Sequence, residues 1–201
     1  MNVITSFWGL LAQPVDFWEE LKATVGNDGA VEQVRVVVEE IRATGVEVPL
    51  RSVISAVAHM AGLEAREMWN RYVAQVSGKI RETPCAVEFI KWASSAGKVA
   101  ILSNTPCKCF ITAFLEAHGL RVNLVLTSDV LLKRKPLKSV FKYALRRLGA
   151  EARDTVYVGD SEEDLGAMAL GMLTIIVGKE GGHVSFNDLC QAKSWLEQIF
   201  K

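Results

Sequence analysis

The pattern of hydrophobic and polar positions changes once along the chain, close to Pro84. Ahead of that proline, a short β-prone run at 3–7 is followed by apolar residues that recur every three or four positions, a spacing typical of amphipathic helices. Glycines or other turn-forming residues end these stretches, and no strand pattern interrupts them. We therefore expect four successive helices, at 15–25, 31–44, 50–61 and 64–81.

Beyond Pro84, short apolar runs rich in β-branched residues alternate with helical patterns. The expected strands lie at 98–102, 124–126, 155–158 and 173–177, and the expected helices at 86–95, 110–118, 137–148 and 161–170. Strands that alternate with helices in this way form a parallel sheet covered on both faces. The first run, at 3–7, is expected to join that sheet, which makes the four-helix stretch an insertion.

The predicted fold class is therefore α/β: a doubly wound parallel sheet with an inserted α-helical cap. We assign the core domain to residues 1–12 and 84–201 and the cap domain to residues 13–83.

Charge and composition exclude some classes of partner. The 23 basic and 23 acidic residues cancel and form no long basic block, so neither nucleic acid nor an anionic membrane is an expected partner. No apolar run reaches the roughly 18 residues of a membrane span. The first residues lack the basic leader of a secretion signal, and we expect a cytoplasmic protein.

The four scattered cysteines are expected to be free thiols, and the three histidines lack the spacing of a zinc site.

Polar residues gather where the predicted strands end. Ser103 and Asn104 close one strand, Asp160 and Asp164 follow another, and Lys135 precedes a helix. In open parallel sheets, ligands bind beyond the carboxyl ends of the strands. Hydroxyl and amide groups can hold phosphate oxygens, a lysine can neutralise them, and carboxylates can hold Mg²⁺. Together these residues predict a phosphate and magnesium site.

Each of these residues also has an ordinary structural interpretation. Asp160 could cap the helix that follows it, and Ser103 and Asn104 could be simple turn residues. Lys135 belongs to a basic run at 133–135, and such runs usually form solvated surface. The order of the residues along the chain, more than any one of them, favours a site.

Four segments in this order resemble the haloacid dehalogenase-like (HAD) superfamily, in the form with a helical cap inserted after the first strand. They are Pro84-Cys-Ala-Val-Glu-Phe-Ile, Val99-Ala-Ile-Leu-Ser-Asn-Thr105, Thr127-Ser-Asp129 running on to Lys135-Pro136, and Tyr157-Val-Gly-Asp-Ser-Glu-Glu-Asp164 with Gly171 beyond. The resemblance implies that Ser103 binds the transferring phosphoryl group and that Lys135 steadies it. It also implies that Asp160, helped by Asp164, holds Mg²⁺.

The chain departs from the family pattern at its first strand. The resemblance implies an aspartate nucleophile and, two residues later, an aspartate that serves as general acid and base; Ser6 and Trp8 stand there instead. A serine hydroxyl is a weak nucleophile unless a base activates it, and an indole has no proton that titrates near neutral pH. The metal also loses one carboxylate. We therefore do not expect standard aspartyl-phosphate chemistry, and expect Mg²⁺ to bind weakly at most.

Three functional hypotheses remain. The leading one is a family member that has lost catalysis, keeps a phosphate pocket of Ser103, Lys135 and Asp160, and binds a phosphorylated small molecule or a protein partner. The second is a Mg²⁺-dependent phosphomonoester hydrolase with a substitute nucleophile, Ser6 or Asp16. The third is a scaffold or complex subunit whose pocket is plugged by Trp8.

Overall fold

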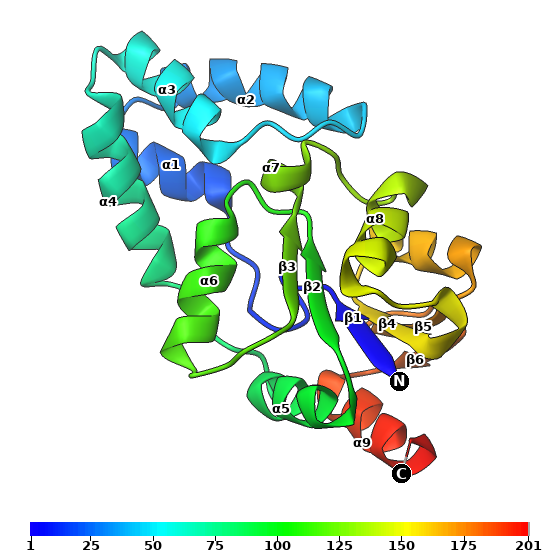
Figure 1. The fold of residues 1–201 in the computed structure, drawn as a ribbon. Coiled ribbons are helices and arrows are strands. Elements are labelled where there is room, and N and C mark those ends of the chain that lie inside the picture. The colour runs from blue at the N-terminus through cyan, green and yellow to red at the C-terminus, as the bar shows by residue number, and fades with distance from the viewer. Residues whose placement is uncertain (201) are drawn as a thin grey trace.

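A computed structural model describes residues 1–200, in which six parallel strands form one sheet. The strands lie in the order β3-β2-β1-β4-β5-β6, with β1 between β2 and β4 (Figure 1). Their bounds are β1 (Asn2–Thr5), β2 (Val99–Ser103), β3 (Leu124–Thr127), β4 (Thr155–Gly159), β5 (Leu173–Val177) and β6 (Val184–Phe186). The chain order reverses direction at β1, as in doubly wound sheets, which confirms the expected fold class.

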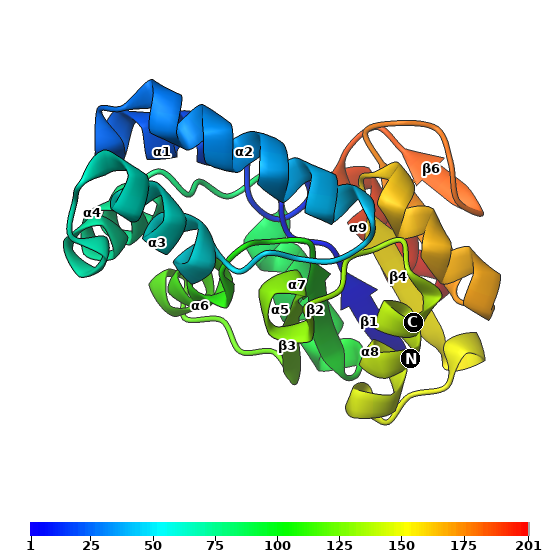
Figure 2. The same cartoon turned by 90° about the horizontal axis from the view of Figure 1, so that it is seen from above.

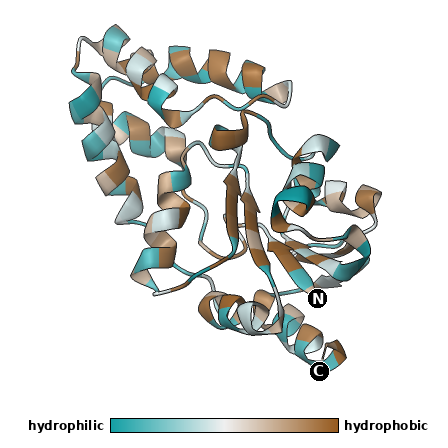
Figure 3. Ribbon diagram, in the orientation of Figure 1, coloured by the Kyte–Doolittle hydropathy of each residue, from teal (hydrophilic) through white to brown (hydrophobic). Residues whose placement is uncertain are grey.

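Helices cover both faces of the sheet. One face packs on α5 (Ala86–Ala96), α6 (Lys108–Ala117) and α9 (Leu189–Ile199), and the other on α8 (Lys138–Leu148) and the 3₁₀ segment η2 (Glu162–Leu170). Side chains alternate between the faces, so that Val3 joins the first apolar cluster and Ile4 the second. The strands are accordingly hydrophobic along most of their length (Figure 3).

The sequence pattern failed to predict several elements, and it predicted one 3₁₀ segment as an α-helix. The missed elements are α7 (Ser128–Leu131), the short 3₁₀ turn η1 (Ala152–Asp154), β6 and α9. Three of them have only three or four residues, which is too short to show a period. The helix expected at 161–170 is present as η2, with 3₁₀ geometry.

The stretch between β1 and α5 contains four helices that share an apolar cluster. They are α1 (Phe17–Val25), α2 (Asp28–Ala43), α3 (Leu50–Ala61) and α4 (Ala65–Ser77). They lie beside the carboxyl ends of β1, β2 and β3, and Phe110 of α6 joins their cluster (Figures 1 and 2). Four helices were expected here, and the assignment of this stretch as a separate domain stays a prediction.

A buried carboxylate ties the α2–α3 connection to the core. Glu47 is 2% exposed; it accepts hydrogen bonds from Arg42 Nε at 2.8 Å and from the Ser128 hydroxyl at 2.5 Å, and it pairs with Arg134. Val46 also forms a β-bridge with Lys133. The helical stretch is therefore anchored next to the loop that carries Lys135.

The prediction of free thiols is wrong. Cys85 at the start of α5 is bonded to Cys190 in α9, and Cys107 is bonded to Cys109 at the start of α6. The first pair is separated by 105 residues in the sequence, and only the packing of α5 beside α9 brings the two cysteines together. Disulfides are more typical of oxidising compartments than of the cytoplasm.

No helix within residues 1–200 is long and apolar enough to cross a membrane.

Candidate functional site

The strand ends place a buried lysine at the centre of a polar cluster. Lys135 is 3% exposed, and its ammonium pairs with Asp164, donates to the Tyr157 hydroxyl at 3.2 Å and lies 3.4 Å from the Ser6 hydroxyl. An ammonium has three N–H donors. The charge of Lys135 is therefore balanced, and its donors are used, by side chains of the protein itself.

Asp164 is the counter-charge of this cluster. One of its carboxylate oxygens accepts from Lys135 and Tyr157, and the other accepts from the Asp160 and Ser161 amides and the Ser161 hydroxyl. Burial alone would raise the pKa of Asp164, but Lys135 and these hydrogen bonds outweigh it and hold the pKa below its usual value. A Cβ on Gly159 would lie 2.4 Å from the Asp164 carboxyl, so the glycine permits this close approach.

The donor set does not fit Mg²⁺ well. Both Asp164 oxygens are already committed to hydrogen bonds, and Glu163 accepts from Asn104 at 2.6 Å, which leaves few free carboxylate oxygens near the strand ends for an ion that prefers oxygen ligands. Among residues 1–200, no group of three or more histidine, cysteine or carboxylate side chains is placed to hold a metal ion.

Asp160 lies against the turn that follows β1. A Cβ on Gly9, whose φ is +81°, would stand 2.0 Å from Asp160 Oδ2. Burial, followed by repulsion from Asp164, raises the pKa of Asp160 to about 6, although Lys135, Lys179 and the Ser6 hydroxyl act in the opposite direction. Near neutral pH the carboxylate is thus charged in a place that disfavours its charge.

This strain on Asp160 gives a stability prediction. A carboxyl whose pKa is higher in the folded state stabilises the fold below about pH 4, and loses that contribution as the pH rises through about 6. Asp160→Asn should therefore raise the free energy of unfolding at pH 8, by about 1–2 kcal/mol after allowance for partial solvent exposure. The gain should disappear near pH 4, which thermal unfolding at the two pH values would measure. The control Glu162→Gln, at an exposed position, should show no such gain, and a less stable Asn variant at pH 8 would contradict the argument.

Ser103 ends β2 and Asn104 follows it, and their role as phosphate ligands stays a prediction. The Asn104 side chain accepts from the Lys135 amide at 2.8 Å and donates to the Lys135 carbonyl at 3.1 Å and to Glu163 at 2.6 Å. Its amide thus holds the backbone of Lys135 in place. Ser103 is 3% exposed at the end of β2.

Trp8 lies between the strand ends and helices α1 and α6. Its indole N–H donates to the Thr105 hydroxyl at 3.1 Å. Its ring makes edge contacts with Phe7, with Phe17 of α1 and with Phe110 of α6. An aromatic cluster therefore occupies the position where the family pattern implies a proton donor.

Asp16, the other possible nucleophile, caps α1. Its carboxylate accepts from the amides of Trp18 at 3.0 Å and Glu19 at 3.1 Å. This is the usual role of an aspartate at a helix N-terminus.

Sequence reasoning missed Tyr157 and Glu47 as parts of the site and its surroundings. Tyr157 is fully buried, and burial followed by the charge of Asp164 raises the pKa of its hydroxyl well above the usual value, so it stays a neutral donor. A tyrosine inside a buried strand is itself a signal, because its hydroxyl needs a partner. Glu47 carried no signal, because two of its partners, Ser128 and Arg134, come from distant segments.

Comparisons with known proteins agree with this architecture. A family model described as haloacid dehalogenase-like hydrolase matches residues 7–171. A phosphoglycolate phosphatase of Pseudomonas syringae pv. syringae (strain B728a) is 24% identical over 177 residues, which are 86% of this chain and 61% of that protein. The chain thus spans about three fifths of that relative's length.

Solved structures show the same fold. A 2-haloacid dehalogenase from Pseudomonas syringae pv. tomato DC3000 matches with a TM-score of 0.73 and 17% identity, over 99% of both chains. A HAD phosphatase from Thermococcus onnurineus matches with a TM-score of 0.66 and 21% identity, over 97% of both chains. At these identities the likeness shows the fold alone.

Proposed function

The chain belongs to the haloacid dehalogenase-like hydrolase family, and on that premise we propose that it is a member without aspartyl-phosphate catalysis, which acts by binding a phosphorylated ligand or a protein partner. One observation carries the proposal: the buried Lys135 ammonium is neutralised and hydrogen-bonded by Asp164, Tyr157 and Ser6. A phosphoryl group at the strand ends would have to displace these contacts before it could use the lysine.

The first strand supports the same conclusion. Ser6 offers no carboxylate for an acyl phosphate, and Trp8, held by Thr105 and the phenylalanine rings, offers no titratable proton for a leaving group. Asp160 is left near the strand ends without a second free carboxylate. In this proposal the former catalytic residues hold the core together, and ligands or partners bind elsewhere on the protein.

A second candidate function is a hydrolase that uses Ser6 as its nucleophile. The observation in its favour is the position of Ser6 next to Asp160. The Ser6 hydroxyl lowers the pKa of the Asp160 carboxyl by hydrogen bonding. A carboxylate beside a hydroxyl is the arrangement a general base needs to activate a serine. Asp160, with a pKa of about 6, would be mostly in the basic form at neutral pH.

An activity assay separates the two candidates. The purified protein is assayed with Mg²⁺ against an aryl phosphate and a panel of phosphomonoesters that includes 2-phosphoglycolate, beside Asp160→Asn, Ser6→Ala and Asp16→Asn. We expect no turnover above the background shared by all variants. Turnover that Asp160→Asn abolishes would overturn the proposal, and whichever of Ser6→Ala or Asp16→Asn also failed would identify the nucleophile.

A further inference from the structure

A cavity of about 570 Å³ lies between α3 and α4, in the cap. It is lined by residues of these two helices and by none from the strand ends: Arg51, Ile54, Ser55, Ala65, Arg66, Trp69 and Asn70. Its volume is within the range usual for small-molecule sites. The cavity is therefore separate from the cluster around Lys135.

Positive charge without a counter-charge distinguishes this cavity. Arg51 and Arg66 both line it, no acidic side chain does, and neither arginine forms an ion pair with another residue in the range 1–200. Between residues 13 and 83, Arg35 pairs with Glu32 and Arg42 with Glu39 and Glu47, whereas Arg71 and Arg81 form no ion pair with a described residue but do not line the cavity. Both arginines are exposed residues, so their charges are open to an anion from solvent, which would supply the counter-charge that the described residues do not.

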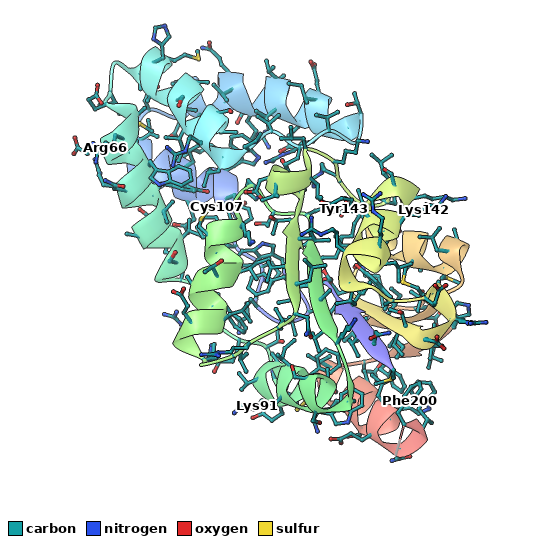
Figure 4. The ribbon with its side chains drawn as sticks, in the orientation of Figure 1. Arg66, Lys91, Cys107, Lys142, Tyr143 and Phe200 are labelled. Carbon is teal, nitrogen blue, oxygen red and sulfur yellow. A yellow bond between two sulfur atoms is a disulfide. The ribbon has the colours of Figure 1, made fainter. Side chains whose placement is uncertain are left out.

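The geometry of the cavity prepares Arg51 for such an anion. Its guanidinium lies over the Trp69 ring, 4.6 Å from the ring centroid, and this stacking limits the freedom of a long side chain. A stacked guanidinium keeps its N–H donors in one plane, available at the edge for bidentate contacts. Arg66 projects from α4, at the side of the cap away from the sheet (Figure 4).

We infer that the α3–α4 cavity binds a phosphomonoester, whose phosphate lies between Arg51 and Arg66. A phosphate dianion has three oxygens for two guanidinium groups, whereas a carboxylate has a single charge and two oxygens. The Asn70 amide offers a further donor, and Ile54, Ala65 and Trp69 offer apolar contact for the organic part. This inference stands whether or not the strand ends retain any catalysis.

Titration calorimetry on the full chain tests the inference, with phenyl phosphate, inorganic phosphate and benzoate as probes. We expect phenyl phosphate to bind saturably at millimolar concentration or below, and more tightly than either of the other two. Phenyl phosphate is chosen because it combines the dianion with an apolar ring, while each of the others lacks one part. No saturable binding of phenyl phosphate, or equal binding of benzoate or inorganic phosphate, would overturn the assignment.

Variants locate the binding. Arg66→Gln should weaken phenyl phosphate binding about tenfold or more, the usual effect of losing a charge-assisted hydrogen bond, and Arg51→Gln should act in the same direction. The matched control is Arg71→Gln, which removes an exposed arginine of the same helix that does not line the cavity, and it should leave the affinity unchanged. An equal loss in Arg71→Gln, or a loss in Ser103→Ala with none in Arg66→Gln, would place the binding elsewhere and overturn the inference.

Discussion

Lys135→Met should lower the free energy of unfolding by about 3–5 kcal/mol, the usual cost of removing one partner from a buried ion pair. Lys135 and Asp164 are almost fully buried, with side-chain exposures of 2% and 0%. Methionine keeps much of the lysine's apolar length, so the loss comes mainly from leaving the Asp164 charge without its counter-charge. The measurement is denaturant unfolding of the purified variant near neutral pH.

Two further variants make the Lys135 experiment specific. Lys133→Met removes an exposed lysine two residues away and should change the stability little. Adding Asp164→Asn to Lys135→Met should cost less than the sum of the two single changes, because each removes the charge that the other leaves unpaired. A loss in Lys133→Met equal to that in Lys135→Met, or strict additivity of the double variant, would show that the buried pair does not hold the strand ends together.

Cys190→Ala should lower the free energy of unfolding by about 2–5 kcal/mol, and the melting temperature by roughly 5–15 °C. The Cys85–Cys190 bond joins residues 105 positions apart, and a cross-link over so long a loop restricts the unfolded chain strongly. Cys109→Ala breaks a bond between residues only two positions apart, so it is the matched control, with a much smaller expected loss. Thermal unfolding with and without a thiol reductant measures both.

Reductant should remove the difference between the wild type and Cys190→Ala, since both chains then lack the long cross-link. A wild-type melting temperature that does not respond to complete reduction, or a Cys109→Ala variant as unstable as Cys190→Ala, would contradict the prediction. The first result would mean that the packing of α5 on α9 is stable without the bond.

The sequence by itself determined five of the six strands, most of the helices and the family. These follow from local patterns: the β-branched run before Gly159, the helical spacing between 15 and 81, and the order of polar residues at the strand ends. It also determined that Ser6 and Trp8 stand where the family pattern implies aspartates. Such features can be read locally because a strand or helix shows its buried face in the spacing of its own side chains.

Only the tertiary structure decided what the site residues contact. Lys135 was expected to steady a phosphoryl group, which stays a prediction; the structure shows its contacts with Asp164 and Tyr157, and Asn104 holds the Lys135 backbone. Trp8 lies among rings of α1 and α6, and Cys85 meets Cys190. Each of these contacts joins segments that are distant in the sequence, apart from that of Trp8 with Phe17 of α1. A residue's type fixes which bonds it can form, but the packing of helices on the sheet fixes which partner is near enough to form them.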